Sequence, residues 1–287
     1  GGTGVNTRLL MPDGAAIARA AELLKAGEIV AFPTETVYGL GANALSERAV
    51  AKIFAAKGRP NDNPLILHVS DVCEVDALAV VTERAKLLMD AFWPGPLTII
   101  LKKGPGVPDA ATPNLPTVAI RMPENPGALA LIKAAGLPVA APSANASGRP
   151  SPTAASHVME DLAGKIPLIL DGGPCKWGLE STVLSLVGEP TVLRPGAVTP
   201  GRDMIEEVLG AARLDARTLR PLNEGEKPSS PGMKYTHYAP KARVFLADGE
   251  PGELAKTAAA LYDGCKAKGM NPIILASKQT SGFYAGR

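Results

Sequence analysis

Short apolar runs of strand length alternate with longer segments of helical character along most of this chain, and this alternation limits the folds open to it. The apolar run 65–69, for example, follows the helix-forming segment 47–57 after a turn that contains glycine and proline. Runs of this length are typical of buried strands. Because helices and strands alternate irregularly, and strands lie closer together before residue 195, the pattern predicts a mixed α/β sheet.

The same reading gives an expected set of elements. Helices are expected at 15–27, capped by Asp13 and ended by Gly27, and at 47–57, 82–92, 128–135 and 202–209. Strands are expected at 28–34, 65–69, 97–102, 118–121, 138–141, 168–171, 182–186 and 191–194, the last two as a hairpin. Segment 38–46 contains two glycines and is expected to be turn-rich.

Composition changes sharply after residue 210. Residues 1–209 are expected to form one domain, and 210–240, rich in Pro, Gly, Ser and charge, a linker. The linker carries Tyr235 and His237, which an inert spacer would not need. Residues 241–287 are expected to form one βαβ unit, with strands at 244–247 and 272–276 around a helix at 253–267. One such unit is too small to cover its own faces, so this second domain is expected to be incomplete.

Composition excludes several classes of protein. Hydrophobic residues make up 46% and charged residues 20% of the 287 residues, which describes a globular chain rather than a disordered one. A net charge of +2 provides no global field for nucleic acid, and 4% aromatic residues argue against a base-stacking platform. Three isolated cysteines and the lack of a signal or membrane segment favour a soluble cytoplasmic protein.

A cationic turn, KGRP, joins the segment 47–57 to the strand at 65–69. Lys57 and Arg59 flank Gly58, and a lysine point charge beside an arginine fork could hold a polyphosphate. The alternative is a solvated surface turn, which is the better interpretation of KGRP alone. No GxxxxGK[ST] phosphate loop, HExxH or GxSxG motif is present, so any nucleotide is bound by other means.

The segment APSANASG follows an apolar strand. Ser143 and Asn145 would then emerge at the carboxyl end of that strand, where open α/β sheets bind ligands. Small residues around them would let backbone amides approach a ligand closely. A plain polar turn explains the same residues about equally well.

Other polar residues stand at strand ends. Arg121 could clamp a carboxylate, although a salt bridge is the simpler interpretation, and the same applies to Arg194. Thr36, in FPTETVYGLG, could contact a small polar substrate, but threonine also favours strands. His68 lies in an apolar run, where a histidine is more often a core residue than a ligand-binding one. Ser181 is compatible with a hydroxyl contact to a ligand, and equally with a tight hairpin. The acids within these motifs are Glu35 and Glu180, and nothing in the sequence marks either as a general base.

Each motif is weak alone, but their order is specific. FPTETVYGLG, KGRPxxxPLxxHV, WPGPLT, PSANASGxxSPT, DGGxxxxGxESTV and LRPG together closely resemble the YrdC-like family over roughly residues 8–245, and PGMKYTHYAP resembles the linker of its longer, two-domain members. The resemblance implies a twisted open mixed sheet with a concave basic face, followed by the linker and a partial Rossmann-like segment. It implies threonylcarbamoyl-AMP synthesis from L-threonine, bicarbonate or CO2, and ATP, releasing pyrophosphate, for N6-threonylcarbamoyladenosine in tRNA.

The resemblance also assigns site residues by motif. For ATP these are Lys57, Arg59, Asn63, Thr117, Ser143, Asn145, Ser151 and Arg194, with Tyr235 and His237 as a lid; for L-threonine they are Thr36, His68, Arg121, Ala141 and Ser181. Mg2+ is expected on the phosphates, without protein ligands, and no residue is assigned as acid or base. One departure is Asn125, where the family pattern has a histidine; it is not expected to alter substrate contacts.

Two alternatives remain open from the sequence. One is a module that binds double-stranded RNA or the ribosome by shape and phosphates, without catalysis. The other is the carbamoyltransferase unit of hydrogenase-maturation proteins, which the missing zinc-finger cysteines and the KYTHYAP linker disfavour. If the synthase reading holds, the expected partners include tRNA and the proteins that transfer the threonylcarbamoyl group to it.

Overall fold

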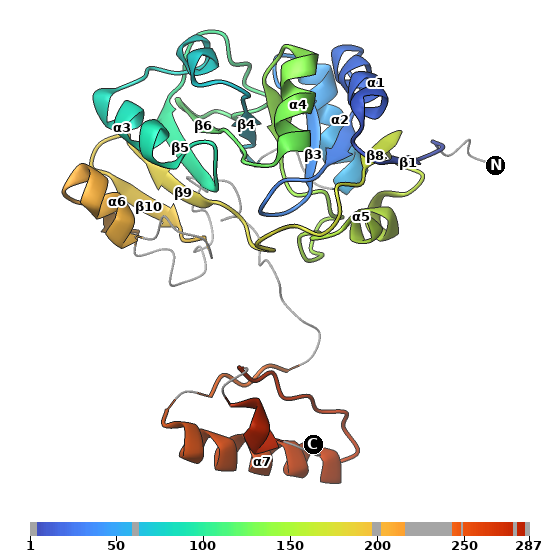
Figure 1. The fold of residues 1–287 in the computed structure, drawn as a ribbon, viewed down its shortest axis with the longest axis vertical. Coiled ribbons are helices and arrows are strands. Elements are labelled where there is room, and N and C mark those ends of the chain that lie inside the picture. The colour runs from blue at the N-terminus through green and yellow to red at the C-terminus, as the bar shows by residue number, and fades with distance from the viewer. Residues whose placement is uncertain are drawn as a thin grey trace. The chain divides into compact units, whose positions relative to one another are not determined.

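The computed structural model describes residues 5–58, 63–196, 202–215, 243–247, 249–277 and 280–284. The chain divides into two compact units, residues 1–238 and 239–287 (Figure 1). Most of the expected linker 210–240 lies outside the described residues, so the three-part division at 209 and 240 remains a prediction.

The described part of the first unit is built on one mixed sheet of 11 strands. In spatial order the strands are β1 (Arg8–Leu10), β8 (Leu168–Leu170), β2 (Val30–Phe32), β3 (Gly39–Asn43), β7 (Val139–Ala141), β4 (Ile66–His68), β6 (Thr117–Arg121), β5 (Leu97–Lys102), β9 (Thr182–Ser185), β10 (Thr191–Arg194) and β11 (Arg213–Leu214). Strand β4 is parallel to β6 but antiparallel to β7, and β5 is antiparallel to β6 but parallel to β9. The predicted mixed α/β sheet is confirmed.

Helices cover both faces of this sheet. Helices α1 (Gly14–Lys25) and α4 (Pro126–Ala135) lie side by side on one face (Figure 1). There they bury Val30 and Phe32 of β2, whereas the intervening Ala31 faces the larger apolar cluster on the other side. The remaining helices of this unit are α2 (Glu47–Lys57), α3 (Glu83–Phe92), α5 (Ala155–Leu162) and α6 (Arg202–Leu209), with a 3-10 turn at Val72–Ala77.

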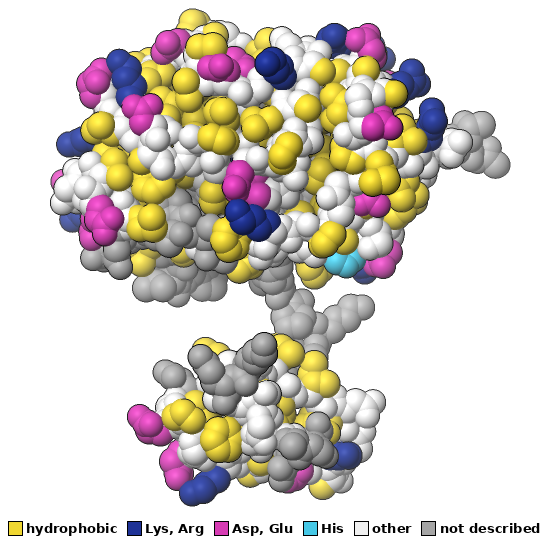
Figure 2. Space-filling model, in the orientation of Figure 1, with side chains coloured by type: hydrophobic (Ala, Val, Ile, Leu, Met, Phe, Trp, Pro, Cys, Tyr) yellow, Lys and Arg dark blue, Asp and Glu magenta, His cyan; other side chains and the backbone are white. Residues whose placement is uncertain are grey.

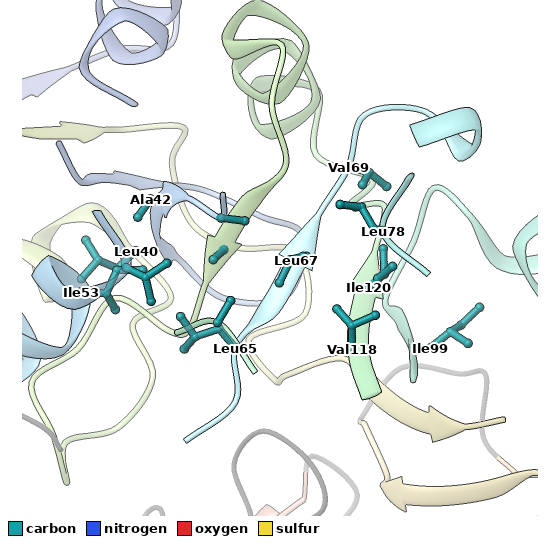
Figure 3. Packing of buried hydrophobic residues seen from close by; sticks show 14 of the residues in the cluster. Leu40, Ala42, Ile53, Leu65, Leu67, Val69, Leu78, Ile99, Val118 and Ile120 are labelled. Atoms are coloured by element: carbon teal, nitrogen blue, oxygen red, sulfur yellow. The ribbon is translucent and has the colours of Figure 1, made fainter. Parts of the chain in front are cut away.

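The larger cluster joins strands that are far apart in sequence. Figure 3 shows Leu40 of β3 and Ile53 of α2 beside each other, with Leu67 of β4 between them and Ile120 of β6. These side chains are fully buried. Because they alternate with residues that face the other side, β4 and β6 present Ile66, His68, Ala119 and Arg121 to the opposite face.

Most expected elements of the first unit are confirmed, and α2, β5 and α6 match to the residue. The turn-rich interpretation of 38–46 is wrong, because residues 39–43 form strand β3. A Cβ on Gly41 would lie 2.7 Å from Val139 Cγ1, so this glycine permits close packing rather than a turn. Strands β1 and β11, the helix α5 and the 3-10 turn were not expected from the sequence.

The second unit contains helix α7 (Pro251–Ala267) and a 3-10 turn at Ser281–Tyr284. The two strands expected at 244–247 and 272–276 are wrong: neither segment forms a strand in the described residues. A parallel pair requires neighbours on both faces of its strands. Here Leu246 and Leu275 are 95% and 92% exposed, so the described residues provide no such covering.

Charged side chains of both signs are mixed on the face that Figure 2 shows. Among the described residues visible there, lysine and arginine lie between acidic and apolar side chains and do not form one continuous patch. The basic character expected of the concave face therefore remains a prediction.

Candidate functional site

A pocket with a volume of about 140 Å3 lies over β4 and β6. It is bordered by segments 34–39, 63–68, 141–143 and 180–181, which are far apart in sequence. The predicted residues that line it are Thr36, Asn63, His68, Arg121, Ala141, Ser143, Ser151, Ser181 and Arg194. The fold thus brings both predicted groups, for ATP and for L-threonine, to one place.

Six predicted residues are not among those that line this pocket, and three of these six belong to the described structure. Lys57 contacts the backbone of the loop that carries Ser143 and Asn145, and Thr117 begins strand β6, where it pairs with Lys102. Arg59, Tyr235 and His237 lie outside the described residues, so their predicted roles remain predictions.

Arg121 ends strand β6, where His68 of β4 is its partner in register. Its guanidinium is buried and held at all three nitrogens. Nε donates to the carbonyl of Gly95 at 3.2 Å, Nη1 to Thr36 Oγ1 at 3.0 Å, and Nη2 to Glu35 Oε1. One N–H group on each of Nη1 and Nη2 is left without a partner among the described residues, and Arg121 lines the pocket. Such a group can bind a carboxylate.

His68 is a neutral acceptor in this pocket. Its Nδ1 lies 3.1 Å from the carbonyl oxygen of Ile66 and 3.3 Å from that of Val139. Because both partners only accept, Nδ1 carries the hydrogen and Nε2 keeps a lone pair. Burial, together with the charge of Arg121, lowers the pKa of His68 to about 3. The ring is therefore uncharged at neutral pH and can accept a hydrogen bond from a ligand.

Asn63 carries the clearest sign of a missing partner. Asn63 is 2% exposed and lines the pocket, and its Oδ1 is buried with no hydrogen-bond donor among the described residues. Leaving such an acceptor unsatisfied costs about 1–3 kcal/mol. A ligand with an N–H or O–H group at this position would remove that cost.

The opposite wall is formed by Ser151, Glu180, Ser181 and Arg194. Ser151 Oγ donates to Glu180 Oε1 at 2.5 Å. Arg194 Nη2 donates to the carbonyl and the hydroxyl oxygen of Ser181, at 2.8 and 3.2 Å. Burial lowers the pKa of Arg194 to about 10, and the charge of Glu180 opposes this shift. Arg194 therefore stays cationic at neutral pH. Its hydrogen bonds to Ser181 hold the guanidinium in place.

Lys57 holds the APSANASG loop. Its Nζ donates to the carbonyl of Ser143 and, at 2.6 Å, to that of Asn145; the side-chain oxygen of Asn145 lies at 3.4 Å. The backbone N–H of Ser147 donates to the Lys57 carbonyl at 2.9 Å. Gly58 adopts φ 63°, so α2 ends there with Lys57 in its last turn, facing the loop. A contact between Lys57 and a triphosphate remains a prediction.

Sequence reasoning gave no role to Glu35 or Glu180, and it did not predict the contacts that Tyr38 makes inside the protein. Tyr38 is fully buried, and burial with the charge of Asp171 raises its pKa, so its hydroxyl stays protonated. That hydroxyl donates to the carbonyl of Gly173 at 2.7 Å. The motif FPTETVYGLG contains Glu35 and Tyr38, but their partners lie 86 and 135 residues away, so no local signal could reveal them.

Asn125 is the one departure from the family pattern, and the structure gives this side chain a local role. Its side-chain oxygen accepts from the backbone N–H groups of Gly127 and Ala128, at 2.9 and 3.1 Å, and so caps α4. In the described part of the chain, no group of three potential metal ligands is found. None of the described helices has the length and apolarity that a membrane span requires.

Comparison with known proteins agrees with this architecture. The family described as telomere recombination (Sua5, YciO and YrdC) matches residues 22–196, and the family described as threonylcarbamoyl-AMP synthase, C-terminal domain, matches residues 201–284. The threonylcarbamoyl-AMP synthase of Bacillus subtilis is 50% identical over 94% of this chain and 76% of its own length. That of Pyrococcus abyssi is 47% identical over 93% of this chain and 79% of its own length.

Solved structures give the same result. The crystal structure of P. abyssi Sua5 complexed with L-threonine matches with a TM-score of 0.85 and 45% identity, over 92% of this chain and 77% of that one. A full-length HypF structure matches with a TM-score of 0.55 at 24% identity, which indicates a shared fold alone. The chain belongs to the Sua5, YciO and YrdC family.

Proposed function

We propose that this protein is an L-threonylcarbamoyladenylate synthase, a nucleotidyltransferase that uses L-threonine, bicarbonate or CO2, and ATP, and releases pyrophosphate. Its product would serve N6-threonylcarbamoyladenosine formation in tRNA, in the cytoplasm, through proteins that transfer the threonylcarbamoyl group. Relatives at 50% and 47% identity carry the name threonylcarbamoyl-AMP synthase. A structural relative at 45% identity is described as complexed with L-threonine.

The observation that carries the proposal is the set of unused hydrogen-bonding groups in the pocket. Arg121 offers two N–H groups, and His68 Nε2 offers an acceptor. Asn63 Oδ1, which was predicted to contact ATP, offers a second acceptor in the same pocket. A free amino acid with a side-chain hydroxyl supplies the complementary groups: a carboxylate that accepts, and amine and hydroxyl groups that donate. Valine, which has the shape of threonine but no hydroxyl, would leave an acceptor unsatisfied.

The nucleotide would occupy the remainder of the pocket. Ser143, Ser151 and Arg194 line it, and the loop behind Ser143 is held by Lys57. Asn145, Thr117 and Arg59 complete the predicted ATP contacts, with Tyr235 and His237 as a lid. Mg2+ fits here only if phosphates and water supply most of its ligands, because no cluster of ligating side chains occurs in the described residues. Bound there, it would neutralise phosphate charge.

The chemistry requires positioning more than proton transfer by the protein. The threonine nitrogen bonds to the carbon of CO2 and loses a proton, which gives a carbamate. A carbamate oxygen then attacks the α-phosphorus; the new O–P bond forms, and the bond to the β-phosphate oxygen breaks to release pyrophosphate. Arg121 would fix the amino acid and Arg194 would stabilise charge on the phosphates, so both reactants are held in line.

The test is pyrophosphate release from ATP with each substrate omitted in turn. Release is expected only when L-threonine and bicarbonate are both present, and L-valine should support at most about a hundredth of the rate. Release that ignores threonine contradicts the proposal. If the protein instead binds double-stranded RNA and releases no pyrophosphate, the RNA-binding alternative replaces it.

A further inference from the structure

Glu35 is a buried carboxylate to which the proposed chemistry gives no role. Its side chain is 3% exposed, and that of its partner Arg121 is 4% exposed. Oε1 accepts from Arg121 Nη2, and Oε2 accepts from the backbone N–H of Glu124 at 3.1 Å. Both oxygens are therefore engaged inside the protein, and Glu35 is not among the residues that line the pocket.

The backbone of Glu35 is fixed as well. Its carbonyl oxygen accepts from the backbone N–H of Trp177 at 2.9 Å, and the next carbonyl, of Thr36, accepts from Gly178 at 3.0 Å. The carboxylate thus stands on a segment joined to the 172–181 loop. A rigidly placed carboxylate can hold a long, rotamer-rich side chain in one orientation.

Arg121 needs such a partner, because its charge is buried. The other two groups that it contacts, the Gly95 carbonyl and the Thr36 hydroxyl, are neutral. Glu35 supplies the opposite charge and engages Nη2, one of the two nitrogens that still have an N–H group for a ligand. Without it, Nη2 would turn toward other acceptors on the pocket wall.

We propose that Glu35 is a positioning residue that holds Arg121 for the carboxylate of the amino-acid substrate. This inference rests on the proposed function, in which Arg121 binds L-threonine. It assigns Glu35 an effect on threonine binding and none on nucleotide binding.

The chain contains a matched control in Asp161. This carboxylate also accepts from one arginine and one backbone amide: Arg149 Nε at 2.9 Å and the N–H of Ala146 at 3.0 Å. Its side chain is 8% exposed, and it supports the loop that carries Ser143, on the proposed nucleotide side. Both carboxylates can be changed to amides of the same shape.

The experiment measures kcat and the KM values for L-threonine and ATP in wild type, Glu35→Gln and Asp161→Asn. Glu35→Gln is expected to raise the threonine KM roughly tenfold to a hundredfold, the effect of losing a hydrogen bond between charged groups, and the ATP KM less than about threefold. Asp161→Asn should leave the threonine KM within about threefold of wild type. A Glu35→Gln enzyme with an unchanged threonine KM, or with equal rises in both KM values, overturns the inference.

A double-mutant cycle separates positioning from a general structural role. In an Arg121→Met background, Glu35→Gln should change the threonine affinity, measured by calorimetry, by less than about threefold. A change as large as in wild type means that Glu35 acts independently of Arg121 and contradicts the inference.

A second variant covers the case in which Glu35→Gln does not fold. Glu35→Asp keeps the charge but withdraws it by one methylene, and about a tenfold rise in threonine KM is expected with a wild-type circular dichroism spectrum. An unchanged KM for this variant also contradicts the inference. If wild type binds no threonine, the proposed function and this inference both fail; if wild type is active and the Glu35 variants match it, only this inference fails.

Discussion

Leu67, in the first unit, is fully buried, whereas Leu275, in the second, is 92% exposed. Both stand in short apolar runs flanked by proline, and the sequence predicted a strand for each. Leu67 lies on β4, which pairs with β6 and β7. In the described part of the second unit, Ala255 is the only hydrophobic residue that is buried. The difference shows that an apolar run becomes a strand only where neighbouring strands and helices cover it.

The largest contrast is expected between ion pairs. Arg121→Met leaves Glu35 buried without its partner and should lower the free energy of unfolding by about 3–5 kcal/mol, with loss of threonine-dependent activity. In the second unit, Lys256 pairs with Glu253, and both side chains are more than three-quarters exposed, at 76% and 77%. Lys256→Met should change stability by no measurable amount. Urea denaturation checks both variants, and equal effects would contradict the contrast.

Apolar truncation gives the second contrast. Leu67→Ala should lower the free energy of unfolding by about 2–5 kcal/mol, because it opens a cavity between β4 and the helices. Leu275→Ala removes the same atoms from an exposed position and should have almost no effect. Thermal melts of the two variants test this, and a large loss for Leu275→Ala would mean that the second unit buries this residue in solution.

A third contrast concerns pH. The pKa of His68 is about 3 in the folded protein, and the ordinary value is 6.5. Between these values the unfolded state binds the additional proton, so stability is highest above pH 6.5 and decreases as the pH falls toward 3. His68→Gln should remove about 2 kcal/mol of the stability difference between pH 7 and pH 5.

The control for the pH effect is the second unit of the chain. Residues 239–287 contain no histidine, so hydrogen exchange of peptides from the second unit should not follow this titration. If stability still decreases between pH 7 and pH 5 in the His68→Gln variant, another group causes the pH dependence.

The smallest effect is expected from one hydroxyl. Tyr38→Phe removes the hydrogen bond to the carbonyl of the half-buried Gly173, which should cost about 1 kcal/mol. Tyr262→Phe, on α7, is the matched variant in the second unit and should be neutral. Guanidinium denaturation measures both, and a neutral Tyr38→Phe would mean that water replaces the lost bond.

The sequence predicted the sheet and most of the pocket, because its signals are local. The helix over 47–57 follows from Ser46, which caps it, and from Gly58, which ends it. Residues such as Ser143 and Arg121 could be placed at strand ends by pattern and by family resemblance.

The remainder depends on partners far apart in the chain. The contact between Lys57 and phosphate stays a prediction, and the carbonyl oxygens that its ammonium binds lie on a loop 86 and 88 residues later. Glu35 carries no local mark of its role, because Arg121 reaches it only when β6 lies in the sheet. Strand β3 was not predicted, because its glycines are typical of a turn. Their reason is the close packing of Phe32 and Val139 against Gly41, which lies outside any local sequence pattern.

Tyr38 connects three parts of the pocket wall through one residue. Its N–H donates to the carbonyl of Pro152 and its carbonyl accepts from Ala144, both at 2.8 Å, while its hydroxyl binds Gly173. Opening any of these loops therefore strains a bond to the same residue. We expect the three loops to open and close as one cooperative unit, so that a ligand ordering one of them slows hydrogen exchange in all three.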